Sequence, residues 1–405
     1  MNWKLIRVID AYMGIPLLFG ISLVKKLVKQ PSPHPDGVKR ILLIKFWGIG
    51  NIFMLLPAIH SLSSAYPNAT IDFLTLESNR DALTVISVVD NIVTINTRSL
   101  PLFIGSWMRA VSCLKNNNYD IIIDFEQFAR FSALIAHQIE APEIIGFDTL
   151  GQRRSSLFTC AVPYDNCVHV TRSFASLAAI VSCTPELPSN KSGLIVRSDV
   201  LSRGRAILDE CGIRSDLICL VMHIGTSGNF QDRRWLPERY AELADRLVDA
   251  FQVRVVFTGL REEAFLIRET VSHIRSESAV VDLSGQLPFA DYFALIASAD
   301  LVISADTAAV HLASALDIPI VGLYGPNSPT LYGPWGKSGL AIYQQLDCSP
   351  CITNFNAKLH TCRHPAGRGA CMQAIEVTDT FQKIQRYYFD PEAPCRLEKL
   401  DRNES

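Results

Sequence analysis

A strand–helix–strand pattern in the last third of the chain limits the fold more than any other feature. Residues 301–304 predict a buried strand, residues 308–316 a helix, and residues 318–323 a second buried strand. Consecutive strands joined through a helix are typical of a parallel α/β sheet. Asp306 and Thr307 precede the helix, where unpaired backbone N–H groups favour a phosphate. The alternative is that Asp306 only caps the helix.

The same alternation of apolar runs and helix-length segments extends through the rest of the chain. A turn-rich stretch at residues 185–192 separates two halves with this pattern. We therefore expect an α/β protein with two Rossmann-like, doubly wound parallel sheets. The expected strands are residues 40–45, 70–75, 91–95, 119–125, 217–223, 253–258 and 279–283, in addition to the two above.

The charge is unevenly distributed, although the whole chain of 405 residues has a net charge of only −2, which argues against a nucleic-acid-binding protein. Residues 1–40 contain seven Lys or Arg and two Asp, so this part carries +5 and the remainder −7. The apolar run at residues 11–24 is shorter than the ~20 residues that span a bilayer. We expect a helix on the inner surface of the cytoplasmic membrane. The alternative is a helix packed on the protein itself.

These patterns predict four parts of the chain. A basic membrane-surface segment and linker (1–37) precedes a first Rossmann-like domain (38–188), a second Rossmann-like domain (189–375), and a C-terminal helix and tail (376–405). The eleven cysteines suit a reducing cytoplasm. Zinc is one interpretation of the C-x-x-C pair and the two cysteines after it, and free or locally paired thiols are favoured over it. These four residues are Cys348, Cys351, Cys362 and Cys371.

The segment Asp306-Thr307-Ala308-Ala309-Val310-His311, with residues 323–329 (LYGPNSP), resembles the C-terminal signature of glycosyltransferase family 9. Its best-known members are the ADP-heptose:lipopolysaccharide heptosyltransferases, and Ala308 replaces their usual glycine. The resemblance implies a GT-B fold, in which the two domains face a cleft. It also implies that the second domain binds a nucleotide-sugar donor. The implied donor residues are Asp306, Thr307, Ala308, Ala309, His311 and Gly325.

A second resemblance covers His223-x-Gly225 and residues 233–237 (RRWLP), where Arg233 replaces the family's lysine. The glycine and hydroxyl residues between these motifs, followed by Arg233 and Arg234, are suited to hold a diphosphate. We expect Thr226, Ser227 and Arg233 to do so, and Arg233 to stabilise the leaving diphosphate without a metal. The alternative is that both arginines are solvated surface charges.

The first domain departs from the family at one position. After the strand at 40–45, the loop with Gly48 and Gly50 leads to Asn51, where the best-known members have an aspartate as general base. An amide cannot accept a proton at neutral pH. Glu126, at the carboxyl end of a later strand, is our candidate base, and Asp124 is a rival. Glu126 could instead begin a helix or pair with Arg130.

Lys45, Arg130 and Arg153 are candidate phosphate or acceptor contacts. By resemblance, the chain is an inverting glycosyltransferase that moves a sugar, with heptose favoured, from ADP-heptose to a lipid-linked saccharide such as lipopolysaccharide core. No cofactor is expected. Two other classes stay open: a nucleotide-sugar-binding protein without catalysis, which Asn51 suggests, and a GT-B-shaped sugar-nucleotide epimerase.

Overall fold

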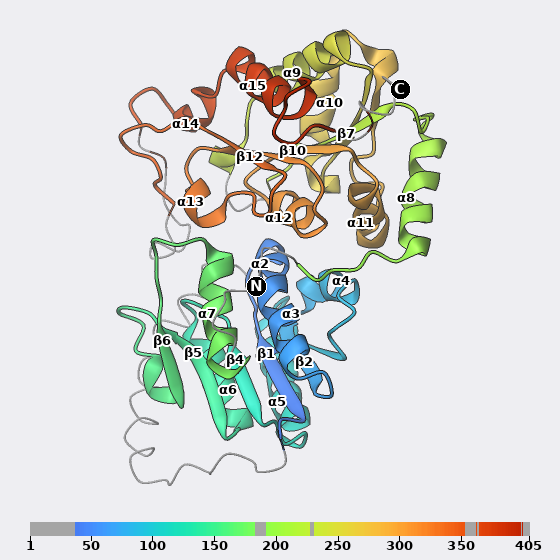
Figure 1. Ribbon diagram of the computed structural model, residues 1–405. Helices are drawn as coiled ribbons and strands as arrows, with labels where there is room; N and C mark the ends of the chain where they lie inside the picture. Colours follow the sequence, from blue (N-terminus) through green and yellow to red (C-terminus); the bar gives the residue numbers. More distant parts are fainter. Residues whose placement is uncertain are drawn as a thin grey trace. The chain divides into compact units, whose positions relative to one another are not determined.

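The computed structural model describes residues 37–182, 192–226, 231–352, 362, 364–397 and 399 (Figure 1). The chain divides into two compact units, Met1–Gly193 (unit 1) and Leu194–Ser405 (unit 2). The expected membrane-surface helix at 11–24 and the candidate donor residue Ser227 lie outside the described residues.

Unit 1 contains a six-stranded parallel sheet in the order β3-β2-β1-β4-β5-β6. The central strand β1 has the sequence RILLI, and four of its five residues are buried, as expected for a strand covered on both faces. The strands are β1 (Arg40–Ile44), β2 (Thr70–Leu76), β3 (Asn91–Ile95), β4 (Ile121–Asp124), β5 (Glu143–Asp148) and β6 (Cys160–Pro163).

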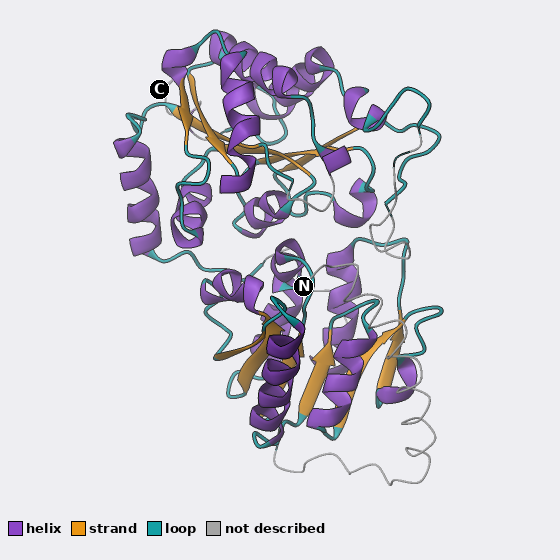
Figure 2. Ribbon diagram, turned by 180° about the vertical axis from the view of Figure 1, so that it is seen from behind, coloured by secondary structure: helices purple, strands orange, loops and turns teal. Residues whose placement is uncertain are grey.

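Helices cover both faces of this sheet, so unit 1 is doubly wound. On one face α3 packs against α7, which lies in front of the sheet in Figure 1, and on the other α5 packs against α6. Figure 2 gives the view from behind. The helices are α2 (Ile49–Met54), α3 (Leu56–Ala65), α4 (Arg80–Thr84), α5 (Leu100–Lys115), α6 (Arg130–Ile139) and α7 (Val170–Ser182).

Unit 2 repeats this topology with a parallel sheet in the order β12-β11-β10-β7-β8-β9. Its strands are β7 (Ile218–His223), β8 (Val253–Thr258), β9 (Val280–Asp282), β10 (Leu301–Ala305), β11 (Ile320–Tyr324) and β12 (Gly339–Tyr343). Its helices are α8 (Ser198–Glu210), α9 (Pro237–Ala250), α10 (Ala264–Ser272), α11 (Phe289–Ala297), α12 (Ala308–Ala315), α13 (Pro329–Tyr332), α14 (Ala370–Gln373) and α15 (Val377–Ile384).

The prediction of two Rossmann-like parallel sheets is confirmed, and each expected strand is present within about two residues of its predicted bounds. Strands β5, β6 and β12 were not predicted. The expected C-terminal helix is α15, which continues as a π-helix over Gln385–Phe389 and packs against α9 within unit 2. In the described part of the chain, none of the helices is long and apolar enough to cross a bilayer.

Candidate functional site

The carboxyl ends of β7 and β10 meet in the middle of the unit 2 sheet, where the strand order reverses. Ligands of open parallel sheets collect at such a point. Residues 224–226 follow β7 and Asp306 follows β10. The topology therefore places the two donor motifs of the sequence at one position on the sheet edge.

Arg233 connects these two motifs. Its Nη1 donates to the backbone carbonyl of Asp306 and forms an ion pair with the Asp306 carboxylate, with Nη1 and Oδ2 3.1 Å apart. Its Nη2 donates to the carbonyl of Thr226 over 3.1 Å. The Asp306 carboxylate also accepts from Asn327 Nδ2 at 2.8 Å. Arg233 is thus largely buried and paired, and the alternative of a solvated surface charge does not describe it.

Arg234 pairs with Glu263, an acidic residue that is not among the predicted site residues. Glu263 Oε1 accepts from the Thr226 N–H at 2.8 Å and lies 3.5 Å from Arg234 Nη2. Arg234 Nε also donates to Thr226 Oγ1 at 3.2 Å. A Cβ on Gly225 would lie 2.0 Å from Glu263 Oε2, so any larger residue there would displace the Glu263 carboxylate from its contact with the Thr226 N–H. Glu263 follows the predicted strand β8, so its position at the carboxyl edge of the same sheet is the sequence signal that could have identified it.

Helix α12 begins directly behind Asp306. Thr307, not Asp306, is the N-cap, because Thr307 Oγ1 accepts from the Ala309 N–H at 3.2 Å. The interpretation of Asp306 as only a cap therefore does not hold. Ala308 is the first helical residue, and His311 is buried one turn later. The N-terminus of α12 thus lies next to the Arg233–Asp306 pair.

Gly325 and His223, one from each of the two predicted donor motifs, have structural contacts of their own within unit 2. A Cβ on Gly325 would meet Met372 Sδ at 2.7 Å and Cys371 Sγ at 2.9 Å, so the glycine allows α14 to pack against this loop. His223, at the end of β7, lies 3.2 Å from Thr258 Oγ1 through its Nδ1 and contacts the Tyr292 ring. Burial lowers the pKa of His223 to about 4, so it is neutral at pH 7.

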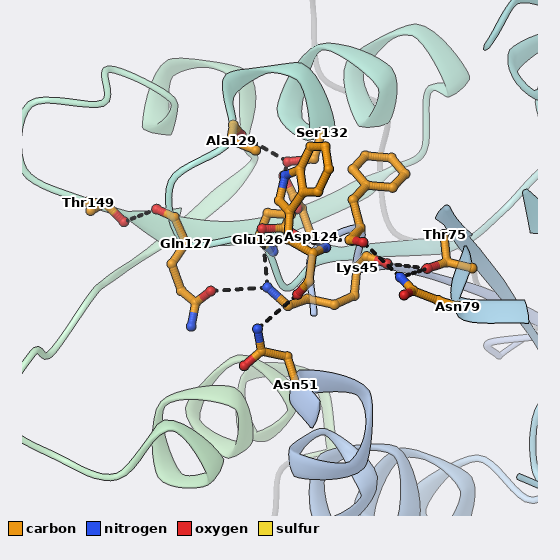
Figure 3. A network of polar contacts seen from close by, with 12 residues as sticks. Lys45, Asn51, Thr75, Asn79, Asp124, Glu126, Gln127, Ala129, Ser132 and Thr149 are labelled. Atoms are coloured by element: carbon orange, nitrogen blue, oxygen red, sulfur yellow. Dashed lines mark hydrogen bonds and ion pairs between the residues drawn. The ribbon is translucent and has the colours of Figure 1, made fainter. Parts of the chain in front are cut away.

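In unit 1, the corresponding reversal of strand order lies between β1 and β4, and Glu126 stands at it (Figure 3). Glu126 Oε1 accepts from the backbone N–H groups of Phe46 at 2.7 Å and Trp47 at 2.9 Å. Its Oε2 lies 3.1 Å from Lys45 Nζ. The carboxylate therefore holds the loop after β1 and pairs with Lys45 rather than with Arg130.

Lys45 is only 1% exposed, which is rare for a lysine. Its Nζ donates to Gln127 Oε1 at 3.1 Å and lies 5.5 Å from the centroid of the Phe174 ring. Burial lowers the pKa of the Lys45 amine, and the negative charge of Glu126 acts against this. Lys45, Glu126 and Gln127 thus form a compact polar group at the carboxyl edge of unit 1 (Figure 3).

The rival base, Asp124, is fully buried beneath this group. It accepts from Ser132 Oγ at 2.7 Å and pairs with Arg154, which is also fully buried and donates to the Glu126 carbonyl. Burial raises the pKa of the Asp124 carboxyl, and Arg154 acts against this. Arg153, the predicted phosphate or acceptor contact, is exposed, and its neighbour Arg154 is the buried arginine. The Asp124–Arg154 pair supports Glu126 from behind.

Asn51 lies beside this group in the first turn of α2 (Figure 3). Its Nδ2 donates to the Trp47 carbonyl at 2.8 Å, which closes the loop. Gly48 has a φ of 85°, and a Cβ there would lie 2.9 Å from Asn51 Nδ2. Gly50 is the second residue of α2. Arg130 points elsewhere: its Nε donates to the Gln152 carbonyl at 3.1 Å.

The four clustered cysteines are the candidate zinc ligands of the sequence. All four have free thiols, and the described residues contain no group of three or more His, Cys, Asp or Glu side chains placed to hold a metal ion. The zinc interpretation of Cys348, Cys351, Cys362 and Cys371 and the favoured alternative of free or locally paired thiols both stay predictions, because residues 353–361 and 363 lie outside the described residues.

Comparison with known proteins decides the family. A model of glycosyltransferase family 9 (heptosyltransferase) matches residues 107–360, which is more than half of the chain. The chain belongs to glycosyltransferase family 9. Lipopolysaccharide heptosyltransferase 1 of Pseudomonas aeruginosa is 24% identical over 323 residues, which cover 77% of this chain and 86% of the relative. The chain is thus a glycosyltransferase, as the sequence motifs predict.

Solved structures agree with this assignment at the level of the fold. The family 9 glycosyl transferase of Veillonella parvula superimposes with a TM-score of 0.70 and 18% identity, covering 86% of this chain and 96% of that one. Escherichia coli heptosyltransferase WaaC, solved with ADP-2-deoxy-2-fluoro heptose, has a TM-score of 0.64 and 20% identity, covering 85% and 99%. This family 9 glycosyltransferase therefore has the predicted GT-B fold of two Rossmann-like units.

Proposed function

We propose that this glycosyltransferase moves heptose from ADP-heptose to a lipid-linked saccharide of the lipopolysaccharide core, with inversion at the anomeric carbon. The observation that carries the proposal is the convergence of Thr226, Arg233 and Asp306 beside the N-terminus of α12. A cationic fork and a helix N-terminus at one point suit a nucleotide diphosphate. The relatives are named as lipopolysaccharide heptosyltransferases, which supports heptose as the sugar.

The donor diphosphate is held by Thr226, Ser227 and the two arginines, with Asp306, Thr307, Ala308, Ala309, His311 and Gly325 around the nucleotide. As the bond to the anomeric carbon breaks, negative charge develops on the leaving ADP. Arg233, Arg234 and the α12 N-terminus are cationic or partly positive groups in place before the reaction, so they stabilise that charge without reorganising. This proposal requires no metal ion.

Glu126 serves as the general base for the acceptor hydroxyl. Its Oε1 already accepts two backbone N–H groups, whereas Oε2 pairs with the Lys45 ammonium. Oε2 therefore keeps the lone-pair capacity to take the hydroxyl proton while the acceptor oxygen attacks the sugar. Lys45 and residues of the 48–51 loop contact the acceptor, whereas Arg130, which donates to the Gln152 carbonyl, has no part in this proposal.

A nucleotide-sugar-binding protein without transfer activity is the second candidate. The observation that favours it is Asn51, whose amide closes the loop by donating to the Trp47 carbonyl and offers no proton acceptor of basic character. This candidate predicts donor affinity without turnover.

The experiment that separates them uses the purified full-length protein with ADP-heptose, with and without a lipid A-core acceptor extract. ADP release and the mass of the acceptor are followed by mass spectrometry. The proposal predicts ADP release that depends on acceptor, a mass gain of one heptose on the lipid, and equal rates in the presence of EDTA. ADP-heptose binding without release would instead support the binding-protein candidate.

The protein would act at the inner face of the cytoplasmic membrane, where a lipid-linked acceptor is accessible. The basic, apolar N-terminal segment at residues 1–37 supports this placement, because its lysines suit anionic headgroups.

A further inference from the structure

Exposed apolar side chains gather at the start of helix α5 in unit 1. Leu100, Leu102, Ile104 and Met108, which we call the α5 apolar surface, are between 42% and 62% exposed. Single exposed hydrophobic residues are ordinary on protein surfaces, but four within nine residues are not. The surface is also open, since a Cβ placed on Gly105 would meet no atom within 4 Å.

This surface is separate from the side of α5 that builds the core. Phe103, Ser106, Ala110 and Leu114 are buried. The C-terminal half of the helix shows a polar exterior instead, with Ser112 and Cys113 exposed. Core packing therefore does not account for the apolar residues on the outer side of the N-terminal half.

The charges around the surface are basic. Residues 97–119 include Arg98, Arg109 and Lys115 and contain no Asp or Glu. Lys115 pairs with Glu140 at the far end of the helix, and Arg98 and Arg109 flank the apolar residues in the sequence. The charge of Arg98 also helps to lower the pKa of Glu77, which is paired with Arg80 at 3.1 Å. An apolar centre with a basic border is complementary to an anionic lipid surface.

The surface lies on the same edge of the unit 1 sheet as Glu126. Ser106 Oγ accepts from the N–H of Asn96, the residue that follows β3, at 3.0 Å, so this half of α5 is at the carboxyl edge. A cluster of aromatic rings connects the α5 apolar surface with the loop that Glu126 holds. The rings of Phe103 and Trp107 lie 4.9 and 5.0 Å from that of Phe131, which lies 5.8 Å from that of Phe46. Phe46 in turn donates its N–H to Glu126.

We propose that the α5 apolar surface docks unit 1 on an anionic phospholipid bilayer, with Arg98 and Arg109 at the headgroups and the four apolar side chains below them. Docking there would bring the polar end of a lipid-linked acceptor to the Lys45–Glu126 group. This inference rests on the proposed function, and it assigns a membrane contact distinct from residues 1–37.

The test compares full-length variants in a flotation assay with vesicles of phosphatidylglycerol and phosphatidylethanolamine. Leu102→Ser/Ile104→Ser/Met108→Ser removes the apolar centre from exposed positions, so its melting temperature should match that of the native chain. The matched control is Leu260→Ser/Phe265→Ser, which removes two equally exposed apolar side chains from unit 2. We expect the triple variant to partition about tenfold less to vesicles and the control to be unchanged.

Hydrogen exchange locates the contact. Peptides covering residues 97–109 should exchange more slowly with the anionic vesicles than without them, and phosphatidylcholine vesicles or high salt should abolish this difference. Equal partition of the triple variant and the control would overturn the proposal. An exchange rate at 97–109 that the vesicles leave unchanged would also overturn it, because the membrane contact would then lie elsewhere on the chain.

A deacylated, water-soluble acceptor separates this inference from the proposed function. The triple variant should transfer heptose to that acceptor at the native rate and lose activity only with acceptor in vesicles. If the native chain transfers to neither acceptor, the proposed function fails, whereas equal activity of the triple variant on both acceptors overturns the docking surface.

Discussion

The side chain of Arg233 joins the two halves of the proposed donor site, since it contacts both the Thr226 carbonyl and Asp306. Arg233→Met should weaken ADP binding about 10- to 100-fold, because a charge-assisted hydrogen bond contributes about 1.5–3 kcal/mol. Arg233→Lys should lose less, since it keeps the charge but not the fork. Calorimetric titration with ADP measures this. The control is Arg254→Met at the opposite end of β8, and equal affinity of Arg233→Met and this control would contradict the assignment.

Gly225 and Gly105 should respond differently to substitution by alanine, because Gly225 lies against the Glu263 side chain and Gly105 faces open space. Gly225→Ala forces a Cβ to 2.0 Å from Glu263 Oε2, so we expect a loss of about 1–3 kcal/mol in the free energy of unfolding. Gly105→Ala has open space and lies within helix α5, so it should be neutral or stabilising by up to about 1 kcal/mol. Urea unfolding of both variants tests this, and similar stability of the two would argue against a rigid Glu263 contact.

The sequence predicted some of these residues and not others for a physical reason. Asp306, Thr307 and Arg233 belong to local motifs that can be recognised along the chain. Glu263 acts on Thr226 from 37 positions away, and this pairing exists only when the strands are side by side. Likewise, nothing in the sequence distinguishes the exposed Arg153 from the buried Arg154, because the turn at residues 151–154 decides which one faces inward.

At the scale of elements, helix α12 depends on Thr307 as its cap. Thr307→Ala should reduce the free energy of unfolding by about 1 kcal/mol, because the Ala309 N–H loses its side-chain acceptor, whereas Thr307→Ser should retain most of it. Thermal unfolding of the two variants measures the difference. The cap assignment would be wrong if serine and alanine were equally destabilising.

Some strands can be predicted from the sequence and others cannot. Central strands such as β1 and β7 are nearly continuous apolar runs because both faces are covered, and they were predicted. The edge strands β6 and β12 are only partly buried, and β5 contains Gly146, which leaves room for the Phe158 ring. The apolar pattern of such strands is too weak to predict them from the sequence. They form because they pair with a neighbouring strand in the folded sheet.

At the scale of the whole molecule, the two units carry the same strand order and each places its polar group at the same kind of position, where the order of the strands reverses. The repeated topology was predicted from the two similar halves of the sequence. The candidate donor residues belong to short, specific motifs, whereas no motif identifies the candidate base, since Asn51 departs from the family.

The most direct test of this account is the single-turnover rate of heptose transfer by Glu126→Gln. Glutamine keeps the shape and an oxygen acceptor but cannot take up the hydroxyl proton, so the rate should fall at least about 100-fold with ADP-heptose affinity unchanged. Glu143→Gln, at the amino end of β5, is the matched control and should transfer at the native rate. An unchanged rate in Glu126→Gln would contradict the claim that β4 supplies the base that Asn51 cannot.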